Sequence, residues 1–409
     1  MTDTLMTESL VDLATFREDA RRFLDSHLRR RDDAADEWGI GSDRIDVFDS
    51  ISLEEEAKHI RLLRDWQRTK MEHGFGAISW PVRHGGRDLP RAFELAFKEE
   101  EAQYVTPAGH EAFAITLELA LPTVLEWAPG SVCDAVIEPT LRGDLMWCQL
   151  FSEPNAGSDF ASLSTRAVAD GDHWRISGQK VWTSGAKHAD WGLLICRSDP
   201  DAPKHAGMSA FVVRMDSPGI DIRPLKQMTG GESFNEVFLD DVVVPDAQRL
   251  GRPGDGWKVA LTTLAFERTA GTDGGRDIRH RWDRLSALAR HLGRTSDPLV
   301  RQGLARMHTQ AVLCERNAAQ VMAAVAAGET PGPEGSLGKM LYVTGLAQAS
   351  ELAAMLLGAR MTADTGEWGT FAWAHHVCGT PGFRIAGGTD EVQRNIIGER
   401  ILGLPREPA

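Results

Sequence analysis

Residues 150–162, L-F-S-E-P-N-A-G-S-D-F-A-S, begin where a short apolar segment gives way to small and hydroxylated side chains. The stretch carries Ser152, Ser158 and Ser162 among residues that leave backbone N–H groups accessible. A loop of this kind can approach a flat polar ring and donate hydrogen bonds to it. Taken alone, the stretch is more typical of a serine-rich turn between two strands.

A second stretch, residues 178–191, changes that balance. It reads G-Q-K-V-W-T-S-G-A-K-H-A-D-W and places Trp182 beside Thr183 and Ser184 at the end of a predicted strand. An indole can stack on an aromatic cofactor while neighbouring hydroxyls bond to the edge of its ring. The two stretches together favour a cofactor site.

The surrounding chain has the pattern of a β-domain. From residue 145 onward, short segments rich in β-forming residues alternate with turns that contain Gly, Pro or Asp. This spacing is typical of a small barrel or sandwich. The segments are L-M-W-C-Q-L-F, H-W-R-I-S-G, W-G-L-L-I-C-R-S, M-S-A-F-V-V-R-M, I-D-I-R-P-L and F-N-E-V-F-L-D-D-V-V-V-P. We predict a central small β-barrel over residues 145–250.

The two flanks are predicted to be helical. In residues 1–144, apolar side chains such as Leu13 and Phe16 recur at helical spacing, and Ser52 has the position of a helix cap. Residues 251–409 contain long amphipathic runs separated by Gly- and Pro-containing breaks. The expected fold class is therefore α+β multidomain, with an N-terminal helical domain, the barrel and a C-terminal four-helix-type bundle.

Composition limits the function classes. The formal net charge of −14 argues against nucleic acid or an anionic membrane as a partner. The sequence shows no evident signal peptide and no apolar stretch near the roughly 18 residues that span a bilayer. The five cysteines lack any C-x-x-C spacing, so we expect reduced thiols in a cytoplasmic protein without a metal site. They are Cys133, Cys148, Cys196, Cys314 and Cys378.

The motifs resemble those of the acyl-CoA dehydrogenase flavoprotein family. F-S-E-P-x-A-G-S-D and G-x-K-x-W-T-S-G-A-x-x-A-D are followed by P-G-I-D-I-R-P-L and F-N-E-V-F-L-D-D-V-V-V-P. The series continues with G-W-K-V-A-L-T-T-L-A-F-E-R and closes with G-G-T-D-E-V-Q-R-N-I-I-G-E-R. The similarity spans residues 80–406. It implies the helix–β–helix order, bound FAD, removal of hydrogen from Cα and Cβ of an acyl-CoA thioester, and an electron-transfer flavoprotein as acceptor.

The resemblance also implies site residues in the β-domain. Ser152 and Ser158 would contact the isoalloxazine and the bound thioester. Trp182 would stack on the flavin with Thr183 beside it, and Ser184 would bond near N5, which accepts the hydride.

Further site residues are implied in the bundle. Gly388 and Thr389 would meet the FAD pyrophosphate at a helix N-terminus, where unpaired N–H groups favour anions. Arg268 would lie near the CoA moiety.

The catalytic base is missing from its usual place. Most family members carry a glutamate directly before the Gly-Thr of the closing motif, and here that position is Gly387. One branch of the family places the base on the first long helix of the bundle, and the matching residue is Glu267. Glu267 interrupts an apolar stripe, where burial raises a carboxyl pKa towards the range useful for proton transfer. The alternative is a structural Glu267 paired with Arg268 or Arg301.

Gly387 retains a possible function through its backbone. Its N–H could polarise the thioester carbonyl, and the absent side chain leaves room for a branched or bulky acyl group. His375-His376, Glu111 and Glu391 are weaker candidates. His375-His376 lacks a partner at metal-ligand spacing, which favours a surface or core pair.

Two segments depart from the family pattern near the expected adenine end of FAD. Residues 291–298, H-L-G-R-T-S-D-P, contain Arg294 but no Phe-Gly, and residues 354–361 replace a Q-x-x-G-G stretch. A cofactor site shared between subunits is one consequence, so a homotetramer and a heterotetramer both remain open. The alternatives to a dehydrogenase are a non-catalytic or half-site subunit of a heteromer, and a flavin oxidase or monooxygenase on the same fold.

Overall fold

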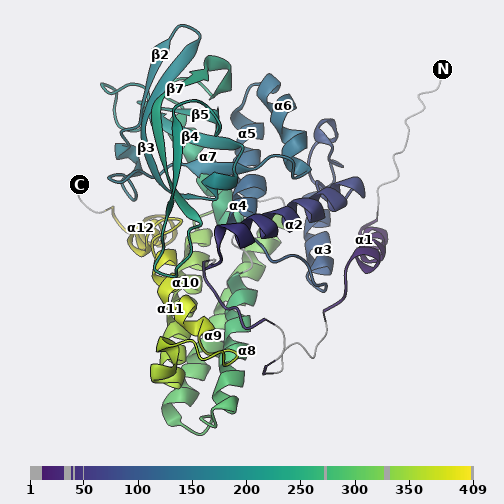
Figure 1. Cartoon of the computed structure of the whole chain (residues 1–409). Coiled ribbons are helices and arrows are strands. Elements are labelled where there is room, and N and C mark those ends of the chain that lie inside the picture. Colours follow the sequence, from purple (N-terminus) through teal and green to yellow (C-terminus); the bar gives the residue numbers. More distant parts are fainter. Residues whose placement is uncertain are drawn as a thin grey trace, which may run out of the picture.

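The computed structural model of the chain describes residues 12–31, 38–39, 42–48, 50–270, 274–326 and 332–406. Within the helices, the side chains of residues 268–270, 274–276 and 325–326 lie outside the description. Figure 1 shows a β-sheet at one end of the molecule, helices of the first third beside it, and a long bundle at the other end.

The first third is helical, as predicted. The cap at Ser52 is confirmed, because its hydroxyl accepts from Glu55 N–H while the Glu55 carboxylate accepts from Ser52 N–H. A π-helical turn at Ile115–Ala120 was not predicted, and it lies against the first helix of the bundle. The α-helices are α1 (Leu13–His27), α2 (Leu53–Glu72), α3 (Arg91–Glu101), α4 (Glu111–Ala114), α5 (Leu121–Trp127) and α6 (Gly130–Leu141).

The β-domain is one eight-stranded sheet in the order β6-β7-β3-β2-β4-β5-β8, with β1 paired in parallel to β4. The strands are β1 (Trp147–Leu150), β2 (Arg166–Asp170), β3 (His173–Ser184), β4 (Trp191–Arg197), β5 (Met208–Arg214), β6 (Ile220–Leu225), β7 (Phe234–Pro245) and β8 (Arg249–Leu250). Each of the six predicted segments contains a strand, and β2 and β8 were missed. The central β-domain of the predicted fold class is confirmed; the exact domain boundaries remain predictions.

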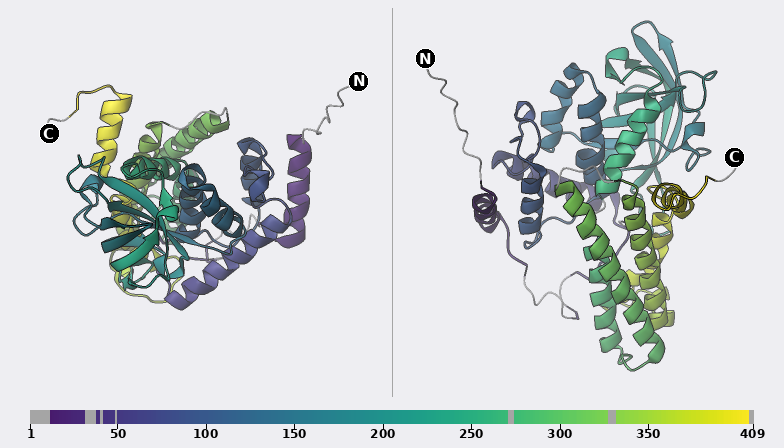
Figure 2. Two further views of the ribbon diagram at one scale, coloured as in Figure 1. Left: turned by 90° about the horizontal axis from the view of Figure 1, so that it is seen from above. Right: turned by 180° about the vertical axis from the view of Figure 1, so that it is seen from behind.

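The C-terminal part is a helical bundle, as expected. It comprises α7 (Gly256–Ala270), α8 (Gly274–His291), α9 (Pro298–Ala326), α10 (Glu334–Leu357), α11 (Ala372–Phe383) and α12 (Asp390–Ile396), which continues as a π turn over Ile397–Ile401. The long helices α8, α9 and α10 run side by side, and α12 lies near the sheet (Figures 1 and 2). Their apolar side chains form one core.

Helix α10 corrects one expectation from the sequence. Glu334–Thr362 is long and apolar enough, by length and composition, to cross a membrane. Its side chains Leu346, Leu352 and Leu356 are instead buried in the core of the bundle. A central bundle helix satisfies the same length and composition criterion, because it is apolar on most of its faces.

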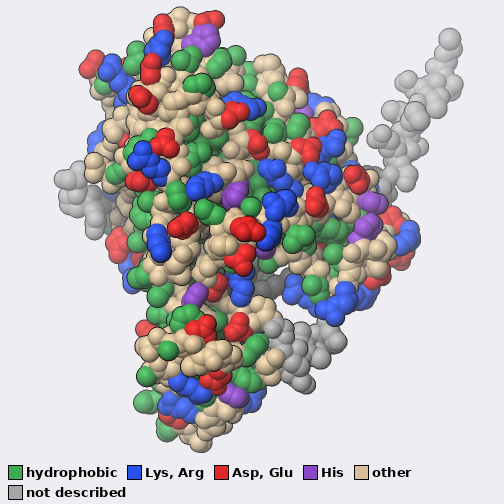
Figure 3. Space-filling model, in the orientation of Figure 1, with side chains coloured by type: hydrophobic (Ala, Val, Ile, Leu, Met, Phe, Trp, Pro, Cys, Tyr) green, Lys and Arg blue, Asp and Glu red, His purple; other side chains and the backbone are tan. Residues whose placement is uncertain are grey.

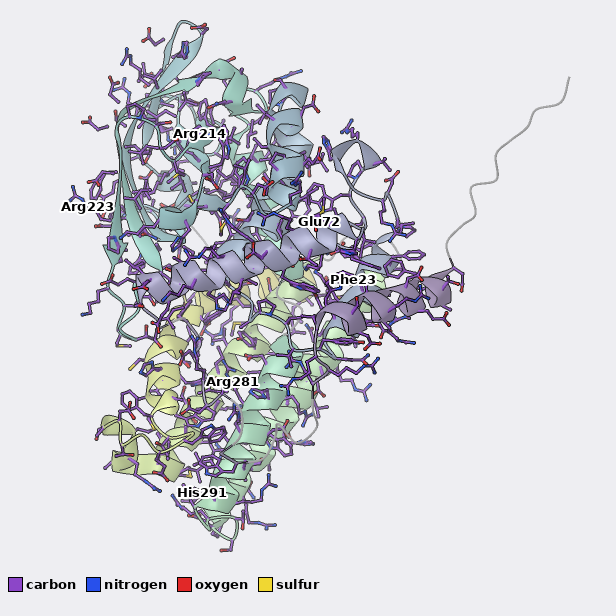
Figure 4. All side chains as sticks on the ribbon, turned by 45° about the vertical axis from the view of Figure 1, so that its right-hand side comes forward. Phe23, Glu72, Arg214, Arg223, Arg281 and His291 are labelled. Carbon is purple, nitrogen blue, oxygen red and sulfur yellow. The ribbon has the colours of Figure 1, made fainter. Side chains whose placement is uncertain are left out.

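The structure also places the histidines and cysteines that the sequence analysis singled out. His376 is fully buried and its Nε2 accepts from Nε of Arg281, which projects from α8 (Figure 4). Burial and the Arg281 charge lower the pKa of His376 to about 2, so the imidazole is neutral and belongs to the core. Each of the five cysteines is a free thiol. On the face in Figure 3, acidic and basic side chains are interspersed.

Candidate active site

A buried ion pair fixes the loop that follows β1. Lys180 of β3 is fully buried, and its Nζ donates to Glu153 Oε1 at 2.9 Å and to the Phe151 carbonyl at 3.0 Å. The other hydrogen bonds to the Glu153 carboxylate come from Ser164 and from the backbone of Thr165. Both ends of the serine-rich loop are therefore tied to one carboxylate.

The electrostatics of this pair favour an ionised Glu153, whereas burial lowers the pKa of Lys180. Burial opposes ionisation of Glu153, but the Lys180 charge and the hydrogen bonds outweigh it and lower the pKa of Glu153 to about 2. A buried carboxylate is stable when it is paired and hydrogen-bonded in this way. The pair also holds the half-buried Ser152 beside β3, where the Ser152 carbonyl accepts from Val181 N–H at 2.9 Å.

Trp182 has an unusual conformation for a large side chain. Its φ is +60°, and the β3–β7 ladder is shifted between Lys180 and Thr183. A non-glycine residue in this region costs on the order of 1–3 kcal/mol and is typically retained at functional sites. The Trp182 side chain is also 61% exposed. The bulge thus turns an indole outward, at an energetic cost that apolar burial does not offset.

The two residues after Trp182, at the same strand end, carry hydroxyl groups. Thr183 is buried, and its Oγ1 has no hydrogen-bond partner within the described chain. Ser184 is nearly buried at 8% exposure. Buried hydroxyls normally find partners, so an unpaired one beside an exposed indole fits a ring with polar edges. The set fits the isoalloxazine of FAD, which Trp182 could stack on and Thr183 and Ser184 could bond to.

Aromatic contacts connect this strand end to the bundle. Trp182 meets Phe234 edge-on at 6.0 Å between ring centroids, and Phe234 meets Phe48 at 5.4 Å. Phe48 in turn stacks on Phe383 at 4.7 Å. Gly382 of α11 permits this approach, because an added Cβ would lie 2.5 Å from the Phe48 ring. Sequence reasoning missed Phe48, which comes from the segment between α1 and α2.

The structure brings Glu267 and Gly387 together. A Cβ added to Gly387 would lie 2.7 Å from Glu267 Oε1, closer than real Cβ contacts allow. The half-buried Glu267 carboxylate therefore adjoins the point from which a side chain at position 387 would begin. The two positions that the resemblance gives for the base are therefore neighbours in space.

The turn at Gly387 leaves two N–H groups available. Gly387 and Gly388 both have positive φ, +64° and +88°. Among the described residues, neither N–H has an acceptor, whereas the Gly387 carbonyl accepts from Gln393 Nε2 at 2.8 Å. Thr389 is the N-cap of α12 and its hydroxyl accepts from Val392 N–H, which confirms the predicted helix start. Contact of Gly388 and Thr389 with a pyrophosphate remains a prediction.

The other residues singled out from the sequence differ in their surroundings. Ser158 is exposed, and the side chain of Arg268 lies outside the described residues. The Arg294 guanidinium bonds within its own chain, to the Met355 carbonyl and to Asp297. Glu391 is exposed in the first turn of α12, as dipole complementarity predicts.

The sequence matches two family models. Residues 148–242 match the acyl-CoA dehydrogenase middle domain, and residues 254–402 match the acyl-CoA dehydrogenase C-terminal domain. Acyl-CoA dehydrogenase IpdE1 of Mycolicibacterium smegmatis is 38% identical over 357 residues, which cover 84% of this chain and 88% of that protein. Acyl-CoA dehydrogenase FadE34 of Mycobacterium tuberculosis is 40% identical over 364 residues, 88% of this chain and 48% of that protein.

Solved structures with a similar fold include proteins described as acyl-CoA dehydrogenases. The "Tcur3481-Tcur3483 steroid ACAD" has a TM-score of 0.77 at 26% identity and covers 97% of this chain and 98% of its own. The ChsE4–ChsE5 complex from Mycobacterium tuberculosis has a TM-score of 0.73 at 25% identity, covering 98% and 100%. Members of the matched family are FAD-dependent flavoproteins of lipid metabolism. The chain therefore belongs to the acyl-CoA dehydrogenase family and is an FAD-dependent oxidoreductase.

Proposed function

We propose that the protein dehydrogenates a bulky acyl-CoA thioester between Cα and Cβ, with Glu267 as the base. The observation that carries this proposal is the 2.7 Å approach of Glu267 Oε1 to the Cβ position of Gly387. The Glu267 carboxylate thereby takes the place that the glutamate of other family members would reach from position 387.

Different residues of the chain have different roles in the proposed reaction. The Gly387 N–H donates to the thioester carbonyl and stabilises the negative charge that develops on its oxygen. Glu267 takes the α-proton as that charge develops, and the Cα–Cβ double bond forms as the β-hydrogen leaves as hydride. Bound FAD supplies the hydride acceptor at N5. Trp182 and Ser184 orient the ring, and Ser152 and Ser158 line the thioester side.

The acyl group is proposed to be of the steroid type. The room expected beside Gly387 is partly filled by Glu267, whose Oε1 would lie 2.7 Å from an added Cβ, so the substrate class does not rest on that space. The word "steroid" in the name of a structural relative supports the same class. We further propose CoA contact by Arg268, an electron-transfer flavoprotein as acceptor, and a cytoplasmic location, which the five free cysteines support.

An anaerobic titration tests the function. The purified chain should show a flavin spectrum, which a steroid side-chain acyl-CoA should bleach more completely than butyryl-CoA. Stronger bleaching by butyryl-CoA would contradict the substrate class. Rapid peroxide release under air would instead favour the oxidase, and a hydroxylated product the monooxygenase.

A half-site subunit of a heteromer is the second candidate. It is supported by the engagement of Arg294 with its own chain and by two structural relatives whose names pair two proteins. An oligomer with a related subunit would complete the adenine end of the cofactor site. A chain that stays colourless at saturating FAD but acquires flavin with such a subunit would favour this candidate.

A further inference from the structure

Lys339 of α10 is bonded to the turn that carries Gly387. Its Nζ donates to the carbonyls of both Ala386 and Gly388. The carbonyl between them, that of Gly387, accepts from Gln393 Nε2 at 2.8 Å. Three successive carbonyls are therefore held by two side chains from different helices. Lys339 thereby fixes the peptide plane before Gly387, and Gln393 fixes the plane after it.

These contacts determine where the N–H groups point. A peptide plane has its N–H opposite its C=O, so a bonded carbonyl also fixes the direction of the next N–H. The Ala386 carbonyl belongs to the same peptide as the Gly387 N–H. Because Lys339 binds this carbonyl, the Gly387 N–H is directed away from the lysine and keeps no acceptor among the described residues.

Lys339 also brings a positive charge to this turn. The charged groups that face it are Glu267 from α7 and Asp390 from α12, and Asp390 is bonded in turn to Arg384. Burial lowers the pKa of the Lys339 ammonium, while the charges of Asp390 and Glu267 act in the opposite direction. The half-buried ammonium is thus attracted by the proposed base and by the Asp390 carboxylate in the first turn of α12.

We infer that Lys339 is a positioning residue that aims the Gly387 N–H at the thioester carbonyl and keeps a positive charge beside the Glu267 carboxylate. This inference rests on the proposed function, because it assigns Lys339 a role in the same site. Lys339 acts through the turn and through Glu267, and neither action requires contact with the substrate.

A spectroscopic measurement tests the first action. Cinnamoyl-CoA is an α,β-unsaturated thioester whose absorption moves to longer wavelength when a hydrogen bond polarises its carbonyl. We expect the flavin-loaded wild type to produce this red shift and Lys339→Met to lose most of it. Lys339→Arg, which keeps a cationic donor, should retain part. Lys258→Met, which removes an exposed lysine of α7, serves as the matched control.

The pH dependence of anaerobic flavin reduction tests the second action. A neighbouring cation favours an ionised carboxylate, so Lys339→Met should move the acid limb of the rate to higher pH. The maximal rate should fall on the order of 10²-fold, as loss of an oxyanion donor does. If Lys339→Met does not retain flavin, Lys339→Gln replaces it in both measurements.

The outcomes separate this inference from the proposed function. A wild type that is not reduced by any acyl-CoA, or a Glu267→Gln variant reduced at the wild-type rate, overturns the proposed function. If wild type is reduced and Glu267→Gln is not, an unchanged red shift and an unchanged acid limb in the Lys339 variant overturn the inference alone.

Discussion

The two walls of the proposed site are built differently. The β-domain wall consists of the loop after β1 and the end of β3, joined by the buried Glu153–Lys180 pair and ending in Trp182. The bundle wall consists of two segments far apart in sequence, which meet where Glu267 Oε1 approaches Gly387. One wall is set by contiguous motifs, and the other depends on tertiary packing.

This difference explains which part of the site can vary. A strand end that must stack on a ring and bond to its edge requires its residues at fixed neighbouring positions. A base needs its carboxylate at one point in space, and either of two adjacent segments can supply it. The β-domain wall therefore keeps the family motif, while in the bundle wall the proposed base is on α7.

The largest expected effect comes from Glu267→Gln. Removing a general base should slow anaerobic flavin reduction by roughly 10²- to 10⁴-fold, while the flavin stays bound by the β-domain wall. Stopped-flow absorbance measures the rate. Glu391→Gln is the matched control, since Glu391 is exposed and follows the same turn. Equal losses in both variants would count against a specific role for Glu267.

Breaking the ion pair should damage the other wall. Lys180→Met leaves the Glu153 carboxylate buried without its cation, which should destabilise the protein by about 3–5 kcal/mol. Denaturant unfolding and flavin content are the measurements. The double variant Glu153→Gln/Lys180→Met should recover part of the stability, because no buried charge remains unpaired. A single variant as stable as the wild type would contradict this account of the loop.

Acid should weaken the same wall. The pKa of Glu153 is lowered from 4.5 to about 2, so its contribution to stability is fully present above pH 4.5 and is lost as the pH falls through about 2. The contribution amounts to roughly 3 kcal/mol. The stability difference between wild type and Glu153→Gln should therefore shrink as the pH is lowered below about 4.5, as measured by denaturant unfolding. A difference that is constant with pH would be inconsistent with an ionised Glu153.

Gly387→Ala should have the smallest effect. A left-handed φ costs an alanine about 1–2 kcal/mol, and the new Cβ would also press on Glu267 Oε1 at 2.7 Å. Gly403→Ala is the control, because Gly403 has φ +65° and nothing within 4 Å of an added Cβ. Thermal unfolding should show a larger loss of stability for Gly387→Ala than for Gly403→Ala. In a Glu267→Ala background, the two losses should become equal. If Gly387→Ala remained the more destabilising substitution in that background, contact with Glu267 would not be the reason.

Most of the fold could be predicted because buried apolar side chains recur along the sequence at the spacing of the helix or strand that carries them. The strands β3, β4, β5 and β7 were found from their apolar residues, whereas β2 has a single buried residue, Ala167, and escaped detection. The π turn at Ile115–Ala120 has no sequence signature that distinguishes it from an α-helix.

More of the β-domain wall than of the bundle wall could be predicted from the sequence. Trp182 and Ser184 lie within one motif, so their proximity followed from the sequence. The resemblance also suggested Glu267 as the base, but its contact with Gly387 arises from packing of α7 against the turn. Lys339 and Phe48 had no motif that singled them out, because each acts through tertiary contacts alone.

The most direct test of the relocated base is α-proton exchange in D₂O. The probe is an acyl-CoA with sulfur in place of Cβ, which has no β-hydrogen to transfer, so exchange at Cα reports the base alone. Mass spectrometry measures the deuterium incorporated. We predict rapid incorporation with flavin-loaded wild type and Glu391→Gln, and a rate at least 10²-fold lower with Glu267→Gln. Incorporation by Glu267→Gln at the wild-type rate would contradict the placement of the base on α7.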